Sequence, residues 1–238
     1  NAATVRLSQE IGIEKIMETA QAIGITSPLK PIPSLALGSL EVSPLEIGVA
    51  YSTLANIGVR QDPKFLLGII DPAELPIERA AEEEDPFSKR VSGQAAYLVT
   101  HLLNGVIESG TGRGVGKLGF DRPAAGKTGT TSDGRDAWFA GYTPELVAVV
   151  WVGFDQHQRG ALSGASAALP IWTSFMKEAV AGDPPTDFLV PPGIVFRRVN
   201  QKGLVCQEDG KEEAFIEGTE PTRSCKKGFF KWLEGLFF

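Results

Sequence analysis

The feature that most constrains the fold of this chain is a change of hydrophobic period near residue 124. From there on, β-like segments replace the helical spacing of the preceding residues, and they lie at Ala124–Thr130, Ala137–Tyr142 and Leu146–Phe154. Tight turns at Ser132–Arg135 and Thr143-Pro144 connect these segments. Strands with such short connections must be antiparallel neighbours. The sequence therefore predicts an α+β fold in which helices flank an antiparallel sheet.

Helical spacing of apolar residues predicts helices on both sides of this sheet in the sequence. The expected ranges are residues 2–23, 43–57, 92–110 and 166–180. The second helix is the most clearly marked, because Ser43-Pro44-Leu45-Glu46 combines a Ser N-cap, a Pro at the first helical position and a capping-box Glu. The buried stripe expected on the third helix consists of Tyr97, Leu98, Leu102, Leu103 and Val106.

The remaining segments suggest how the chain is divided. Lys64–Asp71 is expected to form a short strand, and Pro72–Pro86 an acidic, solvated loop. The run Asp183-Pro184-Pro185 is typical of a boundary. It divides the chain into a main domain at residues 1–182 and a small extension at residues 183–238, in which Ile194–Val199 is β-like.

Charge and the few metal-binding residue types exclude some functions. The net charge of −6 gives no electrostatic support for a nucleic-acid partner. His101 and His157 are isolated from each other and from other candidate ligands, so we expect neither a metal site nor a cofactor. Cys206 and Cys225 fit no zinc pattern, and their spacing agrees equally with a disulfide or with two free thiols.

The tetrad Gly126-Lys127-Thr128-Gly129 admits two interpretations. A phosphate-binding P-loop needs a glycine five residues before Gly126, where the chain has Asp121, and it must open a helix. The residues that follow instead have the pattern of a hairpin. We therefore reject the nucleotide-binding interpretation.

The second interpretation is a strand that clamps a substrate beside a serine nucleophile. A strand edge can bind an extended peptide through main-chain hydrogen bonds. Alternation places Lys127 and Gly129 on one face and Thr128 and Thr130 on the other. The lysine charge and the threonine hydroxyls suit a terminal carboxylate, a strand N–H suits an oxyanion, and a glycine leaves room for close approach. A Lys-Thr-Gly tripeptide alone is a weak signal, so its context decides.

That context closely resembles the class A penicillin-binding proteins, the bifunctional peptidoglycan synthases. The resemblance covers residues 1–180, in the order expected for the C-terminal part of the transpeptidase domain. It rests on Ala36-Leu37-Gly38, Glu41-Val42-Ser43-Pro44-Leu45-Glu46, Val106–Gly112, Gly126–Pro144, Val150-Trp151-Val152-Gly153 and Ala168-Leu169-Pro170-Ile171-Trp172. Leu169 departs from the family, which more usually has Ala there.

The resemblance implies a penicillin-binding transpeptidase or serine β-lactamase-like fold, truncated at its N-terminus, and a two-step acyl transfer. A serine attacks the D-Ala-D-Ala end of a peptidoglycan stem peptide, and an amine of a second stem then takes the acyl group. β-Lactams would be inhibitors, no cofactor is implied, and the complete protein would also carry a glycosyltransferase domain. The substrate-binding residues implied are Lys127, Thr128, Gly129, Thr130 and Thr131, with the Thr130 N–H also serving the oxyanion hole.

The family also needs a Ser-x-x-Lys pair and a Ser-x-Asn motif. Ser27-Pro28-Leu29-Lys30 is followed by prolines that preclude a helix, and Ser224-Cys225-Lys226-Lys227 lies on the wrong side of the Lys-Thr-Gly element, so both are chance matches. Asn1 is interpreted as the third residue of a truncated Ser-x-Asn motif. The nucleophile and general base would then lie outside this chain, which alone would be inactive.

Localisation follows from the same resemblance. No apolar run is long enough to span a bilayer, so anchoring to the extracytoplasmic, periplasmic face of a bacterial membrane would depend on sequence before Asn1. The alternative function is a non-catalytic module of the same fold that binds peptidoglycan or a partner protein. A Ser-x-x-Lys followed by a Ser-x-Asn just upstream would favour the enzyme.

Several other residues have structural interpretations. Trp138, Phe139 and Trp151 are predicted to be core, and Asp133, Arg135 and Asp136 to shape a turn. Arg113 fits either the rim of a cleft or open solvent. The apolar segment at residues 229–238 fits docking on the protein better than a membrane interface.

Overall fold

The computed structural model describes the whole chain except residues 74, 80–89, 155–159, 207–209 and 226–238. It contains two compact units, Asn1–Leu189 and Val190–Phe238, each considered by itself below. No helix in the described part of the chain is both long and apolar enough to cross a membrane.

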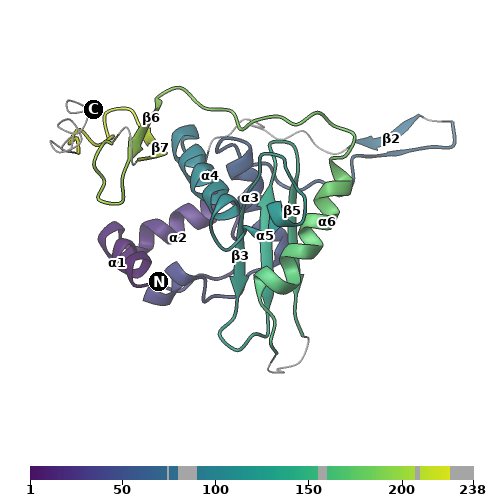
Figure 1. Ribbon diagram of the computed structural model, residues 1–238. Coiled ribbons are helices and arrows are strands. Elements are labelled where there is room, and N and C mark those ends of the chain that lie inside the picture. The colour runs from purple at the N-terminus through teal and green to yellow at the C-terminus, as the bar shows by residue number, and fades with distance from the viewer. Residues whose placement is uncertain (74, 80–89, 155–159, 207–209, 226–238) are drawn as a thin grey trace, which may run out of the picture. The chain divides into compact units, whose positions relative to one another are not determined.

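The centre of the first unit is the predicted antiparallel sheet (Figure 1). Its strands are β3 (Ala125–Thr130), β4 (Ala137–Tyr142) and β5 (Val147–Val152), in the order β3-β4-β5. Thr128 lies opposite Phe139, and Thr130 lies opposite Ala137. The prediction of three consecutive antiparallel strands is confirmed.

The helical segment predicted at residues 2–23 is two helices rather than one. α1 (Ala2–Ile11) and α2 (Ile13–Ala22) meet at Gly12, whose φ of 95° interrupts the helix. Apolar periodicity continues across this break, which is why the sequence pattern did not reveal it. A short 3-10 helix, η1 (Pro33–Leu37), packs against α1.

The helix α3 (Pro44–Ala55) has the capping box that the sequence predicted. The Ser43 side chain accepts from the Glu46 N–H at 3.2 Å, and the Ser43 N–H donates to Glu46 Oε2 at 2.8 Å. The helix ends two residues before the predicted Ile57, and Gly58 N–H closes its end on Thr53 O at 2.8 Å.

The helix α4 (Gly93–Glu108) agrees with its predicted range, but its predicted buried stripe is partly wrong. Leu102 is 65% exposed, whereas the small and polar residues Ala96 and Thr100 are buried beside Tyr97. The Thr100 hydroxyl forms a 2.8 Å hydrogen bond with Tyr142 Oη of β4, so a polar contact joins this helix to the sheet.

One face of the sheet carries the apolar core. The helix α6 (Leu169–Ala179), preceded by the π-helical turn η2 (Gly164–Ala168), covers this face. Trp172 is fully buried, its ring lies 4.9 Å from that of Phe139, and its Nε1 donates to Ala148 O at 3.0 Å. The short helix α5 (Gly114–Lys117) adds Val115 to this core. The helices α3 and α4 also contact the sheet, but their residues are not part of this core cluster.

Among the three aromatic residues predicted to be core, only Phe139 is fully buried. Trp138 is half-buried, and Trp151 is 41% exposed. These two tryptophans lie opposite each other on the face away from Phe139, with ring centroids 6.3 Å apart. Trp151 Nε1 donates to Asp136 Oδ1 at 3.0 Å, which gives its polar edge a partner without full burial.

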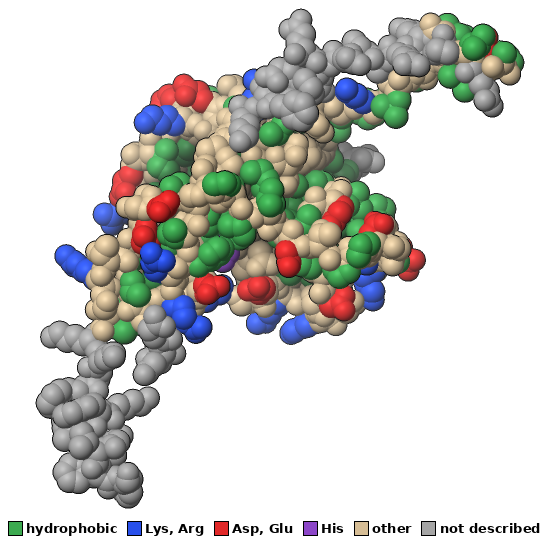
Figure 2. Space-filling view, turned by 90° about the horizontal axis from the view of Figure 1, so that it is seen from above, with side chains coloured by type: hydrophobic (Ala, Val, Ile, Leu, Met, Phe, Trp, Pro, Cys, Tyr) green, Lys and Arg blue, Asp and Glu red, His purple; other side chains and the backbone are tan. Residues whose placement is uncertain are grey.

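The described residues between Lys64 and Arg79 contain the predicted strand, but part of the predicted loop forms a second strand that pairs with it. β1 (Gly68–Ile70) pairs antiparallel with β2 (Pro76–Arg79), and Asp71 Oδ1 accepts from the Ala73 and Leu75 N–H groups in the connecting turn. Part of the predicted acidic loop lies outside the described residues. Hydrophobic side chains, in green, are visible on a projecting segment in Figure 2. The exposed apolar residues of this region include Phe65, Leu67, Ile70 and Ile77.

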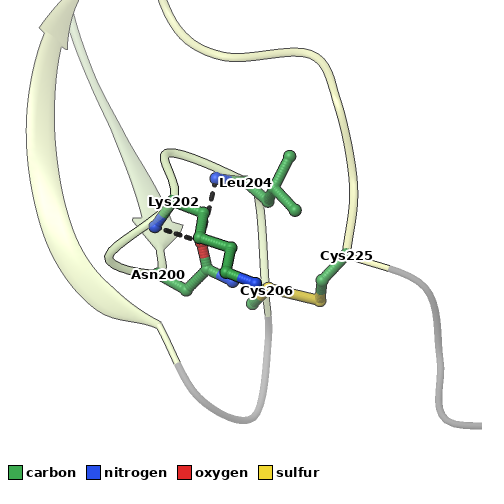
Figure 3. Close-up of a disulfide and its surroundings, with 5 residues drawn as sticks. All are labelled: Asn200, Lys202, Leu204, Cys206 and Cys225. Carbon is green, nitrogen blue, oxygen red and sulfur yellow. Dashed lines mark hydrogen bonds between the residues drawn. A yellow bond between two sulfur atoms is a disulfide. The ribbon is translucent and has the colours of Figure 1, made fainter.

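The second unit is built on the strands β6 (Ile194–Val199) and β7 (Lys211–Ile216), which pair antiparallel. A disulfide joins Cys206 to Cys225, with a Cα–Cα separation of 5.4 Å, and so decides between the two states that the sequence left open. Figure 3 shows the adjoining turn, in which Asn200 Oδ1 accepts from the Lys202 and Leu204 N–H groups at 3.0 and 3.1 Å. The segment 229–238 lies outside the described residues.

The boundary between the two units follows Leu189 instead of residue 182. Three contacts hold the intervening residues to the first unit. Arg122 donates to Asp183 O, Thr186 Oγ1 donates to Glu145 Oε1, and the Phe188 ring meets the Tyr142 ring edge-on at 5.6 Å. The prolines that suggested a boundary therefore belong to an extended segment that packs on the first unit.

Candidate active site

The strand β3 carries the predicted clamp, and its two faces differ. β3 has a strand neighbour on one side only in the described sheet. Because Thr128 and Thr130 lie opposite the core residues Phe139 and Ala137, both threonines share the face that α6 covers. Lys127 and Gly129 therefore lie on the other face, as the alternation predicted.

Thr128 is held by a residue that lies 17 positions earlier in the sequence. Its hydroxyl forms a 2.7 Å hydrogen bond with the hydroxyl of Thr111, in the turn Gly110-Thr111-Gly112. This turn follows α4, and its Gly110 and Gly112 N–H groups both donate to Val106 O at 3.0 Å. The side chain of Thr111 is exposed, so the two hydroxyls lie together at the surface.

Thr130 is held by the backbone at the start of η2. Its Oγ1 accepts from the Gly164 N–H at 3.0 Å. A Cβ at position 164 would lie 2.5 Å from Trp138 O and 2.6 Å from Gly129 O. Only glycine therefore allows this segment to approach the strand closely enough for the hydrogen bond.

Lys127 places its ammonium group at the edge of the strand. Its Nζ lies 2.9 Å from Thr128 O and 3.4 Å from Thr128 Oγ1. Partial burial lowers the pKa of the Lys127 ammonium below its usual range. Although Lys127 and Thr128 start from opposite faces, the lysine reaches around the edge, where one anion can contact both groups.

Thr131 belongs to the turn after β3. Its Oγ1 accepts from the Arg135 and Asp136 N–H groups at 3.0 and 2.9 Å, and Arg135 pairs with Asp133 at 3.1 Å. The Gly134 carbonyl accepts from the Leu162 N–H at 3.1 Å, so the turn is also joined to the segment before η2. The predicted turn role of these charged residues agrees with this geometry.

Asn1 lies at the N-terminus of α1, exposed, with its carbonyl accepting from the Val5 N–H at 3.0 Å. Its side chain does not cap the helix. α1 packs on η1 and α2. No hydrogen bond joins Asn1 to β3 among the described residues, and the role of Asn1 in a Ser-x-Asn motif stays a prediction.

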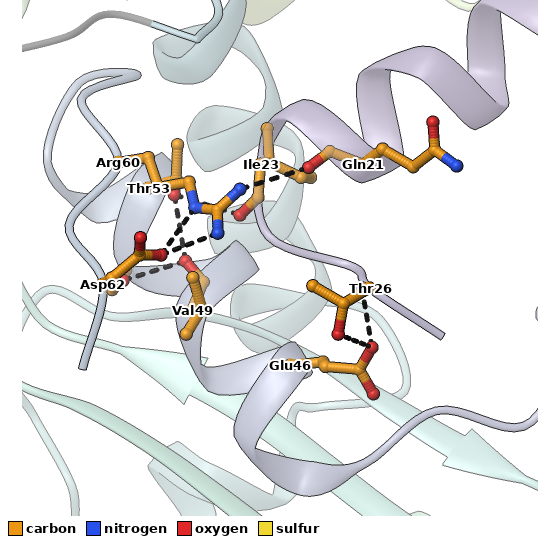
Figure 4. A network of polar contacts seen from close by, with 9 residues as sticks. Gln21, Ile23, Thr26, Glu46, Val49, Thr53, Arg60 and Asp62 are labelled. Atoms are coloured by element: carbon orange, nitrogen blue, oxygen red, sulfur yellow. Dashed lines mark hydrogen bonds and ion pairs between the residues drawn. The ribbon is translucent and has the colours of Figure 1, made fainter. Parts of the chain in front are cut away.

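Ser27, from the first chance Ser-x-x-Lys match, has a structural role. Its hydroxyl donates to Glu46 Oε2 at 2.8 Å, and its N–H donates to Glu46 Oε1. The Thr26 N–H and hydroxyl donate to Glu46 Oε1 at 2.7 and 2.9 Å (Figure 4). Burial of Glu46 opposes its charge, but the donors from Ser43 and Ser27 outweigh this effect and hold its pKa well below the ordinary value of 4.5.

The other residues singled out from the sequence lie in several parts of the chain. Ser224 belongs to the second unit, and Lys227 lies outside the described residues, as does His157. His101 is a half-buried residue of α4, and Arg113 is exposed before α5. The described residues contain no cluster of three side chains suited to a metal ion.

Sequence reasoning missed the partners of the two threonines. The turn Gly110-Thr111-Gly112 had a detectable signal, because it formed part of the family resemblance, but nothing in the sequence joins Thr111 to Thr128. Gly164 had no comparable signal, since its contribution is a backbone N–H. Glu46 was recognised as a cap and not as an acceptor for Thr26 and Ser27.

Comparison with known proteins relates the chain to one family. Residues 1–177 match the model of the penicillin binding protein transpeptidase domain. Penicillin-binding protein 1A of Aquifex aeolicus is 38% identical over 231 residues, which are 94% of this chain and 31% of that protein. The crystal structure of penicillin-binding protein 1A from Haemophilus influenzae matches 94% of this chain and 39% of its own, with a TM-score of 0.83 and 28% identity.

A further solved relative is the PonA1 protein from Mycobacterium tuberculosis in complex with penicillin V. It matches 79% of this chain and 55% of its own, with a TM-score of 0.67 and 25% identity. The chain spans about a third of the length of the first curated relatives that it matches, 31% and 33% for two of them.

Proposed function

The chain belongs to the penicillin-binding protein transpeptidase family, and from this premise we propose that it is the C-terminal part of a peptidoglycan D,D-transpeptidase. The predicted α+β fold is the penicillin-binding transpeptidase fold. The proposed activity is cross-linking of stem peptides ending in D-Ala-D-Ala through a serine acyl-enzyme, which β-lactams inhibit.

The observation that carries this proposal is the arrangement of groups along β3. Lys127 supplies a positive charge at the strand edge, and Thr128 and Thr130 supply hydroxyls within two residues of each other. Cationic and hydroxyl donors suit a carboxylate, which only accepts hydrogen bonds. The Thr130 N–H is proposed as an oxyanion donor together with the N–H of the nucleophile.

The proposed reaction has two balanced steps. The serine Oγ bonds to the penultimate D-Ala carbonyl carbon, the C–N bond to the last D-Ala breaks, and the departing amine takes up the serine's proton. An amine of a second stem peptide then bonds to the acyl carbon and loses a proton, and the serine oxygen is released as a hydroxyl. β3 would position the acyl donor through its terminal carboxylate.

The nucleophile and general base are proposed to lie outside this chain. Within the first unit, Ser27 is bound to Glu46, and the prolines beyond it preclude a helical Ser-x-x-Lys pair. Asn1 is proposed as the last residue of a Ser-x-Asn motif that the complete protein brings to β3. That protein is further proposed to carry a glycosyltransferase domain and to be anchored at the extracytoplasmic face of a bacterial membrane.

The test is labelling of the complete protein with a fluorescent penicillin, followed by mapping of the labelled peptide by mass spectrometry. We expect one labelled serine, in a Ser-x-x-Lys sequence outside these 238 residues. A label on Ser27 would contradict the assignment of the nucleophile. A folded complete protein that no penicillin labels would exclude the enzyme and favour the non-catalytic peptidoglycan- or partner-binding module.

A further inference from the structure

The two threonine hydroxyls of β3 each meet a group from another segment. Thr130 Oγ1 accepts from the Gly164 N–H at 3.0 Å. A hydroxyl has one hydrogen to donate and two lone pairs that accept. Since a lone pair of Thr130 is used by Gly164, its hydrogen stays available for an anion at the strand.

The Thr128 hydroxyl hydrogen is likewise available for an anion if the Thr111 hydroxyl donates to Thr128 Oγ1. The ammonium of Lys127 can only donate, and its Nζ lies 3.4 Å from Thr128 Oγ1. The Thr111 hydroxyl lies 2.7 Å from the same oxygen, and either hydroxyl of this pair can donate. With both Lys127 and Thr111 donating, Thr128 presents its own hydrogen outward, as Thr130 does.

The turn that carries Thr111 holds it in a defined position. Two hydrogen bonds, from the Gly110 and Gly112 N–H groups, join the turn to Val106 O in the last turn of α4. A Cβ at Gly110 would lie 2.9 Å from both the Cα and the O of Val106, so the turn packs tightly on the helix end. The Thr111 hydroxyl thus comes from a backbone that α4 fixes, and it meets β3 from outside the strand.

We propose that Thr111 is a positioning residue for the carboxylate subsite, donating to Thr128 so that the Thr128 hydroxyl hydrogen faces the substrate carboxylate. The inference rests on the proposed function, because it requires a carboxylate-bearing acyl donor on β3. A hydroxyl that is polarised by a second donor is a better donor to a charged acceptor. Thr111 itself acts through Thr128 and does not touch the substrate.

The test compares two probes on the complete protein. The second-order rate constant of acylation is measured with a penicillin that has a free carboxylate and with the methyl ester of the same penicillin. For Thr111→Val, which keeps the shape of the side chain but removes the hydroxyl, we expect a decrease of about fivefold with the carboxylate probe, the size of one net hydrogen bond. The ester rate is expected to stay within about twofold, and Thr111→Ser should restore the carboxylate rate.

The matched control is Thr19→Val, which removes an exposed hydroxyl bonded to Lys15 O in α2. It should leave both rates and their ratio unchanged. An equal decrease for both probes in Thr111→Val, or no decrease for either, would overturn the inference while the labelled wild type upheld the proposed function. A wild type that neither probe acylates would overturn both. The thermal midpoint of each variant shows whether a loss of acylation comes from unfolding. If Thr111→Val unfolds, the ratio of the carboxylate rate to the ester rate in Thr111→Ser decides instead.

Discussion

The two faces of β3 are built in different ways. On the face of Thr128 and Thr130, each hydroxyl is bonded to another segment, and the apolar core around Trp172 lies behind the strand. On the face of Lys127, α4 packs against the sheet, and the ammonium group donates to its neighbour Thr128. Hydrogen bonds from other segments thus hold the side chains of the threonine face, whereas the Lys127 ammonium group lies at the strand edge, where a substrate can reach it.

The largest expected effect comes from removing the support behind the threonine face. Trp172→Ala should lower the free energy of unfolding by about 3–5 kcal/mol, because it leaves a large cavity against Phe139 and removes the hydrogen bond to Ala148 O. The measurement is thermal unfolding of the complete protein. Ile171→Ala, on the exposed side of the same helix, is the control, with an expected change of about 0.5 kcal/mol or less. Equal losses would refute the assignment of Trp172 as the main support.

A smaller effect is expected where η2 meets the threonine face. Gly164→Ala would place a Cβ 2.5 Å from Trp138 O, and relieving that clash requires backbone movement. We expect a loss of about 1–3 kcal/mol in stability, together with slower acylation as the bond to Thr130 lengthens. Gly116→Ala is the matched control, since its Cβ would meet nothing within 4 Å. A Gly164→Ala protein with normal stability and acylation would show that the close approach is dispensable.

A substitution at Glu46 tests whether buried hydrogen bonds away from β3 also stabilise the fold. Glu46→Gln replaces one acceptor oxygen with a donor, so at least one donor among Ser27, Thr26 and Ser43 loses its partner. The expected loss is about 1–3 kcal/mol at neutral pH.

The pH dependence of that loss follows from the lowered pKa of Glu46. Because the folded pKa lies below the ordinary value of 4.5, the unfolded chain binds the proton first as the pH falls. The stabilisation is therefore complete above pH 4.5 and is lost progressively below it. Thermal midpoints of wild type and Glu46→Gln should converge as the pH is lowered, and a constant difference would contradict the assigned pKa shift.

The smallest change in the free energy of unfolding is expected on the lysine face. A substitution there should reduce acylation and leave stability almost unchanged. Lys127→Ala should reduce acylation of the complete protein by a penicillin at least about tenfold, about 1.4 kcal/mol of transition-state stabilisation. Its free energy of unfolding should change by about 0.5 kcal/mol or less, because the side chain is only partly buried and its ammonium group donates to its own neighbour. Lys15→Ala, an exposed lysine of α2, should alter neither quantity. A comparable loss of stability in Lys127→Ala would remove the contrast between the two faces.

Local patterns were sufficient for elements that depend on neighbouring residues. The capping box at Ser43–Glu46 and the ranges of α4 and β4 were predictable, because each depends on residues within a few positions. The break at Gly12 was missed because the apolar spacing continues across it. The pairing of β2 with β1 was missed because the acidic composition of this region indicated a loop. Trp151 was misassigned because a hydrophobic side chain on a strand is buried only where another element covers that part of the face.

The sequence by itself determined that this protein has an antiparallel three-stranded sheet, that Lys127 and the two threonines alternate along its first strand, and that the chain resembles one family. Backbone alternation and short connections are local properties, and they hold wherever the strand lies. Only the tertiary structure decided that Thr111 reaches Thr128 and that Gly164 reaches Thr130. These contacts join residues far apart in sequence, so they depend on how the helices and the sheet pack and not on any local pattern.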